Sequence, residues 1–139
     1  RRVKDVNFEW EKVLTFEGET GPYVQYTHAR ACSVLRKADQ ALGPDVDYRH
    51  LTQDEAFDIV RLLADYPVVL RRAAENYEPF FVTDYLLTLS ERFNKYYHNH
   101  RILTDDDAVR QARLSLVKGV QHVLEGGLTL LGITAPEEM

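Results

Sequence analysis

The apolar residues between positions 108 and 124 recur with the period of an α-helix. Ala112, Leu116, Val120 and Leu124 are spaced by four residues. Further apolar residues widen this stripe: Ala108, Val109, Leu114, Val117 and Val123. A stripe of this width is the buried side of a helix that packs against other helices. The pattern therefore predicts a long helix whose apolar face belongs to the core of a helical bundle.

Local signals indicate where this predicted helix begins and ends. Thr104 and the acidic residues 105–107 precede the stripe, at a place where the helix dipole stabilises negative charge. We interpret this acidic run as a helix cap rather than as a cation site. Gly126-Gly127 predicts an interruption, and a short helix over residues 128–131 then follows until Gly132 closes it.

The first third of the chain predicts two more helices, and no segment of the chain alternates as a strand does. Asn7 suits the cap of a short helix that Gly18 ends. Pro22 suits the first turn of a long helix, because its missing N–H would be unpaired there in any case. This helix is expected to reach about Leu42, ahead of Gly43-Pro44.

The middle of the chain predicts three further helices. Residues 52–55 have the pattern of a capping box, ahead of a helix that Pro67 ends. Its expected core face is Phe57, Val60, Leu63 and Ala64. Helices over about 68–75 and 79–98 follow, and the last directs these residues toward the core: Phe80, Phe81, Tyr85, Leu86 and Leu89. An all-α bundle of five or six helices results.

Composition and charge set broad limits on function. The 139 residues suit one domain, and the formal net charge of −5 is unlike that of a strongly basic nucleic-acid binder. The charge is uneven, however. Residues 20–38 carry Arg30, Arg36 and Lys37 without a carboxylate, and residues 93–104 carry Lys95 and Arg101 without one. These two windows predict local basic surface on an acidic protein.

Several site classes are not expected in this chain. No apolar run reaches the length of a membrane span. The single cysteine, Cys32, predicts a buried thiol and a reducing, intracellular setting. His98 and His100 stand two residues apart, which does not place them on one helical face as a metal pair. We expect no metal site and no catalytic residue. The chain begins without a methionine, so we expect an excised fragment or a processed product.

Tyrosines coincide with both basic windows. Tyr23, Tyr26 and Arg30 are spaced i, i+3 and i+7, which places them along one stripe of a helix. Tyr97 follows Tyr96 at the end of another predicted helix. Tyrosine pairs can simply pack their rings and expose their hydroxyls. Alternatively, rings beside arginine offer a stacking surface for unpaired bases. The residues alone leave these two interpretations open.

Three segments resemble one protein family. Residues 16–37, FEGETGPYVQYTHARACSVLRK, resemble the start of the C-terminal anticodon-binding domain of arginyl-tRNA synthetases. Residues 93–103, FNKYYHNHRIL, are similar to a later helix and loop of that domain. Residues 112–139 resemble its C-terminal end, including the final methionine. The domain is named after an Asp-Ala-Leu-Arg motif, which corresponds to residues 107–110 here, with Val109 in place of the leucine.

This resemblance implies a fold, a partner and a missing part. It implies the anticodon-binding helical bundle of class I aminoacyl-tRNA synthetases over residues 7–139, with residues 1–6 as a linker remnant. The implied partners are the anticodon stem-loop of tRNA-Arg and the parent's own catalytic domain. That domain would use ATP with Mg to ligate arginine to tRNA. Neither nucleotide-site signature of such enzymes occurs here, so we expect the fragment to be inactive, cofactor-free, monomeric and cytoplasmic.

The resemblance also implies individual residues at the anticodon. They are Tyr23, Tyr26, Arg30, Tyr97 and Met139. Weaker candidates by position are Gln25, Asn94 and Arg101. One alternative is a helical scaffold or accessory protein that kept the domain but altered or lost tRNA binding. Related helical domains also end the glycyl synthetase β-subunit, although the opening segment favours the arginyl family.

Overall fold

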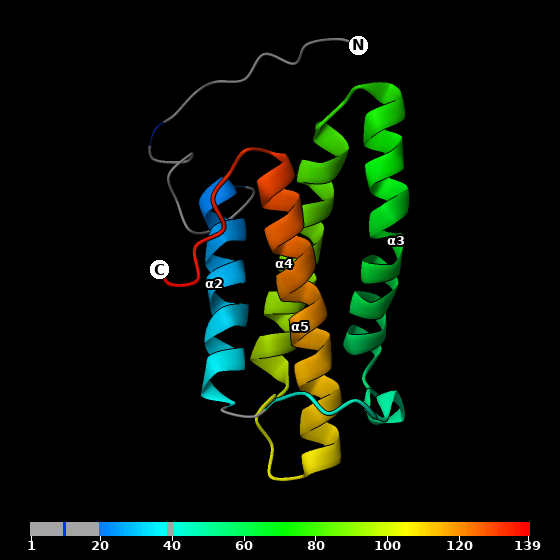
Figure 1. Cartoon of the computed structure of the whole chain (residues 1–139), viewed down its shortest axis with the longest axis vertical. Helices are drawn as coiled ribbons and strands as arrows, with labels where there is room; N and C mark the ends of the chain where they lie inside the picture. Colours follow the sequence, from blue (N-terminus) through cyan, green and yellow to red (C-terminus); the bar gives the residue numbers. More distant parts are fainter. Residues whose placement is uncertain (1–9, 11–19, 39–40) are drawn as a thin grey trace.

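The computed structural model describes residues 10, 20–38 and 41–139. Within these ranges the chain forms four α-helices and one 3-10 turn, and no strand occurs there (Figure 1). The expected all-α fold is therefore confirmed. Apart from residue 10, the predicted helix between Asn7 and Gly18 lies outside the described residues. The elements are α2 (Gly21–Lys37), η1 (Tyr48–His50), α3 (Asp54–Asn76), α4 (Phe80–Asn99) and α5 (Asp107–Leu130).

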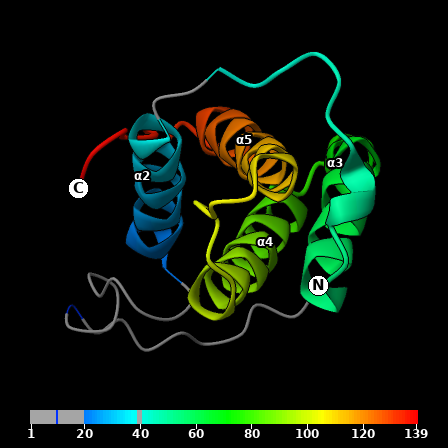
Figure 2. The same cartoon turned by 90° about the horizontal axis from the view of Figure 1, so that it is seen from below.

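The helices α4 and α5 stand between α2 and α3, as the end view shows (Figure 2). The antiparallel helices α3 and α4 are joined by residues 77–79, where Tyr77 takes a left-handed conformation with φ 53°. The helix α2 packs on α4 and α5 from the opposite side. After Gly132, which has φ +72°, the C-terminal tail (residues 133–139) runs back beside α2 (Figure 1).

The core lies where α4 and α5 face each other and their neighbours. The predicted stripe of α5 is confirmed, because Ala112, Leu116, Val120 and Leu124 are all buried. Tyr85, Leu86 and Leu89 of α4 are buried as predicted, and Phe93 and Tyr96 continue that face. Ala108 is exposed, since it lies in the first turn of α5. Burying each large apolar side chain contributes about 1.5–3 kcal/mol to folding.

The helix α3 is continuous through Pro67, so the prediction of two helices separated there is wrong. Pro67 is exposed, whereas the neighbouring Tyr66 stacks on Tyr85 of α4 with ring centroids 5.5 Å apart. The Tyr85 hydroxyl also donates a 2.8 Å hydrogen bond to the carbonyl of Leu62. Packing against α4 thus offsets the local cost of an internal proline, which is about 3 kcal/mol.

The predicted core face of α3 is also wrong. Ala56 and Ile59 are fully buried, whereas Phe57 and Val60 are exposed. Leu63 is half-buried and Ala64 is exposed. Both α4 and α5 contact α3 from the same side (Figure 2). Phe57 and Val60 each follow a buried residue by one position, so they lie about 100° further around the helix and face outward. Phe57 and Val60 instead line a shallow apolar groove that α5 and η1 complete.

Three helix ends differ from their predicted positions. The helix α2 ends at Lys37 rather than at about Leu42. The cap of α3 is Gln53, and no side chain caps it, so residues 52–55 form no capping box. The helix α5 runs through Gly126-Gly127 without interruption. A Cβ atom at Gly127 would lie 2.5 Å from a methyl carbon of Leu86, so this glycine lets α4 approach α5 closely.

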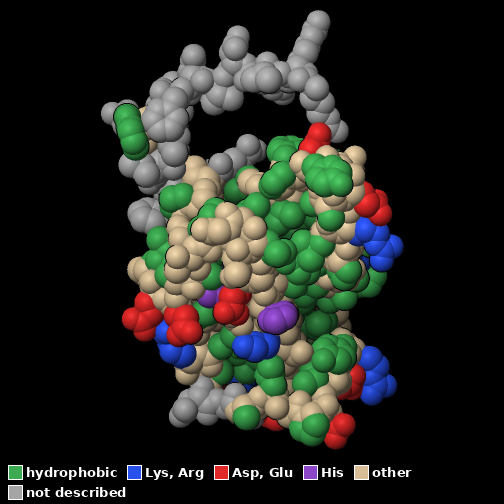
Figure 3. Space-filling view, turned by 45° about the horizontal axis from the view of Figure 1, so that its top comes forward, with side chains coloured by type: hydrophobic (Ala, Val, Ile, Leu, Met, Phe, Trp, Pro, Cys, Tyr) green, Lys and Arg blue, Asp and Glu red, His purple; other side chains and the backbone are tan. Residues whose placement is uncertain are grey.

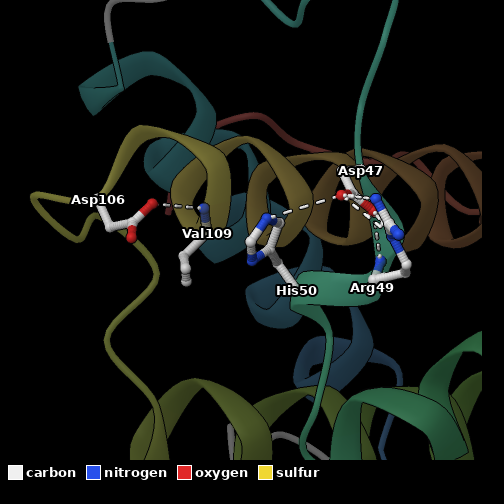
Figure 4. A network of polar contacts seen from close by, with 5 residues as sticks. All are labelled: Asp47, Arg49, His50, Asp106 and Val109. Atoms are coloured by element: carbon white, nitrogen blue, oxygen red, sulfur yellow. Dashed lines mark hydrogen bonds and ion pairs between the residues drawn. The ribbon is translucent and has the colours of Figure 1, made fainter.

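Short-range hydrogen bonds and ion pairs stabilise the loop before α3 and the start of α5 (Figure 4). Asp47 accepts hydrogen bonds from the backbone and the guanidinium of Arg49, and these bonds lower the pKa of Asp47 to about 2. The carboxylate of Asp106 accepts a 3.1 Å hydrogen bond from the Val109 N–H. The predicted acidic cap of α5 is thereby confirmed.

Some large apolar side chains remain outside the core. Val68, Tyr77 and Phe80 are exposed near the turn between α3 and α4, where Figure 3 shows hydrophobic side chains gathered at the surface. Phe80 therefore does not point to the core as expected. The described helices include none with the length and apolar character that crossing a membrane would require.

Candidate nucleic-acid interface

A cavity of about 450 Å³ lies between α2, the end of α4 and the C-terminal tail. Four of the five principal predicted residues line it: Tyr26, Arg30, Tyr97 and Met139. Arg36 and Lys37, from the basic window of α2, line it as well. Residues that are far apart in sequence therefore meet at one concave surface, with rings and cations side by side.

Arg30 lines this cavity and is held by contacts within its own helix, α2, and with α4. Its Nη2 donates a 2.8 Å hydrogen bond to the Tyr26 hydroxyl, one helical turn earlier. Its guanidinium carbon lies 4.6 Å from the ring centroid of Tyr26 and 5.0 Å from that of Tyr97. These are cation–π distances. The planar cation is therefore oriented by contacts with two aromatic rings.

Asn94 of α4 supports Arg30 from behind. Its Oδ1 accepts a 2.5 Å hydrogen bond from Arg30 Nη1, and its Nδ2 donates to the Thr27 hydroxyl at 2.8 Å. Thr27 is fully buried and donates in turn to the carbonyl of Tyr23 at 2.9 Å. Both ends of the Asn94 amide are thus used inside the protein, which makes Asn94 a positioning residue for Arg30.

The remaining predicted residues lie around the cavity rather than in its lining. Tyr23 is half-buried in the first turn of α2, and its side chain is not part of the lining. Gln25 donates a 2.8 Å hydrogen bond to the carbonyl of Thr134 in the tail. Arg101 lines an adjoining cavity of about 350 Å³, which shares Tyr97 and Lys37 with the first. Tyr97 therefore lies at the boundary of two neighbouring cavities.

The tail brings acidic groups to the same surface. Glu137 and Glu138 line the cavity beside Met139. Glu138 forms a 3.0 Å ion pair with Arg36, and both side chains are largely exposed. An anion that approached Arg36 would therefore compete with Glu138. Such exposed ion pairs contribute only about 0–1 kcal/mol, so competition is feasible.

Cys32 and the histidines carry no sign of metal or thiol chemistry. Cys32 is half-buried rather than buried as predicted, and its burial raises the pKa of its thiol. A neutral thiol of this kind is a weak nucleophile. No group of three or more potential metal ligands occurs among the described residues. His100 instead lies 3.3 Å from a carboxylate oxygen of Glu55.

His28 is a residue whose contacts the sequence does not indicate. His28 is 1% exposed, and its Nδ1 lies 2.8 Å from the carbonyl oxygen of Pro136 in the tail. Its Nε2 lies 3.2 Å from the amide nitrogen of Gln121 on α5. A lone histidine on a helix gives no such signal, because both partners are about a hundred residues away.

Comparisons with known proteins agree on one family. A family model described as the DALR anticodon binding domain matches residues 24–139. The arginine–tRNA ligase of Latilactobacillus sakei subsp. sakei (strain 23K) is 53% identical over 138 residues, and that of Alkaliphilus metalliredigens (strain QYMF) is 45% identical over 138 residues. Each alignment covers 99% of this chain but 24% of the relative.

A solved structure gives the same answer. The arginyl-tRNA synthetase of Thermus thermophilus superposes with a TM-score of 0.86 at 40% sequence identity. The superposition covers 98% of this chain and 24% of that protein. The chain therefore spans about a quarter of the length of the relatives that it matches.

Proposed function

Because the chain belongs to the family of DALR anticodon-binding domains, we propose that it binds the anticodon stem-loop of tRNA-Arg as part of an arginine–tRNA ligase. The other parts of that enzyme would carry the catalytic domain, which joins arginine to tRNA at the expense of ATP with Mg. The present domain would then recognise the anticodon of the tRNA, and the catalytic domain would carry out the reaction. The proposal takes residues 7–139 as the domain, residues 1–6 as a linker, a monomer as the binding unit and the cytoplasm as its location.

The observation that carries the proposal is the position of Arg30 between Tyr26 and Tyr97 at a concave surface. An unpaired base has two aromatic faces and polar edges. Tyr26 and Tyr97 are 37% and 39% exposed, so each offers ring surface for stacking. The fixed fork of Arg30 can donate to a base edge or to a phosphate.

The charged residues around the cavity suit the phosphate backbone of an RNA loop. Arg36 lines the first cavity, Arg101 lines the adjoining one, and Lys37 lines both. Together with Arg30, these four cations can attract only a few phosphates, so we expect a shallow dependence of affinity on salt. Each phosphate contact to a single strand contributes a slope of about −0.7 in log affinity against log salt. Met139 adds an apolar wall against which a base can pack.

Fluorescence anisotropy with labelled RNA hairpins tests this proposal. The purified chain should bind the anticodon stem-loop of tRNA-Arg. A stem-loop with the same stem and a substituted anticodon is the matched control and should bind at least about tenfold more weakly, a difference of about 1.4 kcal/mol. Equal affinity for both hairpins would contradict recognition of the anticodon. No binding to either would favour the alternative function of a helical scaffold or accessory protein.

A further inference from the structure

Two side chains of α2 form hydrogen bonds with backbone carbonyls of the C-terminal tail, in addition to the exposed ion pair between Arg36 and Glu138. Gln25 and His28 hold the carbonyls of Thr134 and Pro136, each at 2.8 Å. Gln25 is half-buried near the surface, whereas His28 is almost completely buried. The three residues after Pro136 are those that line the cavity with Arg30. The position of residues 137–139, which form one wall of the cavity, therefore depends on the hydrogen bonds that Thr134 and Pro136 accept.

The hydrogen-bond partners of His28 are compatible with one tautomer. The carbonyl of Pro136 can only accept, so Nδ1 of His28 carries the hydrogen. Nε2 is then an acceptor, and it faces the amide nitrogen of Gln121, which donates. The neutral Nδ1–H imidazole satisfies both contacts at once, so His28 connects α5 to the tail.

Charged residues of α5 fix the orientation of the Gln121 amide. Its Oε1 accepts a 2.9 Å hydrogen bond from Lys118, and its Nε2 donates to Glu125 at 2.9 Å. A flipped amide would place its oxygen against the Glu125 carboxylate and its nitrogen against the Lys118 ammonium. The amide nitrogen of Gln121 is therefore held toward His28, and this selects the acceptor at Nε2.

We propose that His28, oriented by Gln121, is a positioning residue for anticodon recognition: it holds the C-terminal tail so that Met139 completes the cavity around Arg30 and Tyr97. This inference rests on the proposed function of that cavity. The buried contact to Pro136 is the anchor, and the exposed ion pair between Glu138 and Arg36 adds little to it. A domain without the anchor keeps its rings and its arginine but loses one wall of the site.

A double-mutant cycle, with the affinity for RNA as the measured quantity, tests the inference. His28→Gln moves the side-chain N–H toward the position of Nε2 and away from the Pro136 carbonyl, and a chain ending at Pro136 removes residues 137–139 that line the cavity. Each change should weaken binding of the tRNA-Arg anticodon stem-loop about tenfold. The double variant should bind no more weakly than the truncated chain, because both changes remove the same wall. Effects that multiply in the double variant would contradict the proposal, as would full affinity of His28→Gln.

A second measurement follows the tail without any RNA. Met139 is the only methionine of the chain, so a ¹³C-methyl label on methionine gives one NMR signal for the tail. In the parent chain the rings of Tyr26 and Tyr97 should shift this signal. In His28→Gln it should move to the position seen in a short peptide, while the thermal transition stays cooperative. An unmoved signal in the folded variant would overturn the anchor.

The two measurements separate the inference from the proposed function. One outcome is that the unsubstituted chain binds no hairpin while the Met139 signal still moves in His28→Gln. That result would support the role of His28 in holding the tail and would contradict the proposed anticodon binding. His28→Asn serves where His28→Gln does not fold, because its amide N–H lies near the position of Nδ1. It should retain the Met139 signal position better than His28→Ala does. Equal signals in Asn and Ala variants would contradict a role for the Nδ1–H donor.

Discussion

Asn94 accepts a 2.5 Å hydrogen bond from the guanidinium of Arg30, although the two residues are 64 positions apart. This contact joins α4 to α2 directly behind the candidate base-binding surface. It fixes the plane of the guanidinium between Tyr26 and Tyr97, so little side-chain freedom is lost when a ligand arrives. The geometry of the site is therefore determined by a residue that itself faces the protein.

Replacing Asn94 tests this positioning role. In Asn94→Ala, Arg30 keeps its charge but loses the acceptor that orients it. We expect about fivefold weaker binding of the anticodon stem-loop, equivalent to about 1 kcal/mol. Anisotropy titrations against the parent chain measure the effect. Asn76→Ala, at an exposed position at the end of α3 and outside the cavity, is the control and should bind like the parent. Unchanged affinity of Asn94→Ala would show that Arg30 needs no support.

Arg30→Lys separates charge from geometry. An ammonium keeps the positive charge, but it cannot reproduce the planar fork that bonds Tyr26 and Asn94 together. We expect affinity for the stem-loop to fall about tenfold. Arg36→Lys, at an exposed position on the same helix, should lose little because its ion pair needs only charge. Equal losses in both variants would mean that Arg30 acts as a point charge.

Glu138→Gln should strengthen RNA binding. Glu138 pairs with Arg36 at the edge of the cavity and places negative charge where a phosphate would approach. Removing that charge should raise affinity about two- to threefold and make the salt dependence steeper. Glu91→Gln, at an exposed position of α4 outside the cavity, is the matched control. Weaker binding of Glu138→Gln would show that the ion pair supports the site.

Gly127→Ala tests the close contact between α4 and α5. Alanine is favoured over glycine in a helix by about 1 kcal/mol, but its methyl group would meet Leu86. We expect a net loss of about 1–3 kcal/mol in the free energy of unfolding, measured by urea denaturation. Gly21→Ala, where the added carbon would meet no side chain or backbone beyond its own helical turn within 4 Å, should not destabilise the domain. Stabilisation by Gly127→Ala would contradict the packing described here.

The sequence predicted elements whose local signals and packing agree. The stripe around Val120 and the cap at Asp106 were correct because a helix period and an acidic first turn point to the same segment. The three segments that resembled the anticodon-binding family identified it correctly. Pro67 and Gly127 were misread because each is a local break signal that a tertiary contact overrides. Such contacts, here with Tyr85 and Leu86, are not visible in a local pattern.

The candidate site was predicted only in part, for the same reason. A helical stripe joined Tyr26 and Arg30 correctly, but it gave Tyr23 equal weight although Tyr23 lies outside the cavity lining. The tail residues after Gly132 have no period, so their contacts with Gln25 and His28 depend on the whole fold. Which of these residues touch RNA stays a prediction.

The affinity of Tyr97→Ala for the tRNA-Arg anticodon stem-loop, measured together with its melting temperature, tests the central claim most directly. Tyr97 is 39% exposed and its ring centroid lies 6.3 Å from that of Phe93, so its loss should lower the melting temperature while the transition stays cooperative. Loss of a stacking ring should weaken binding about ten- to a hundredfold, corresponding to about 1–3 kcal/mol. Tyr97→Phe keeps the ring and should bind nearly as the parent does. A folded Tyr97→Ala chain with unchanged affinity would show that this cavity is not where the anticodon stacks.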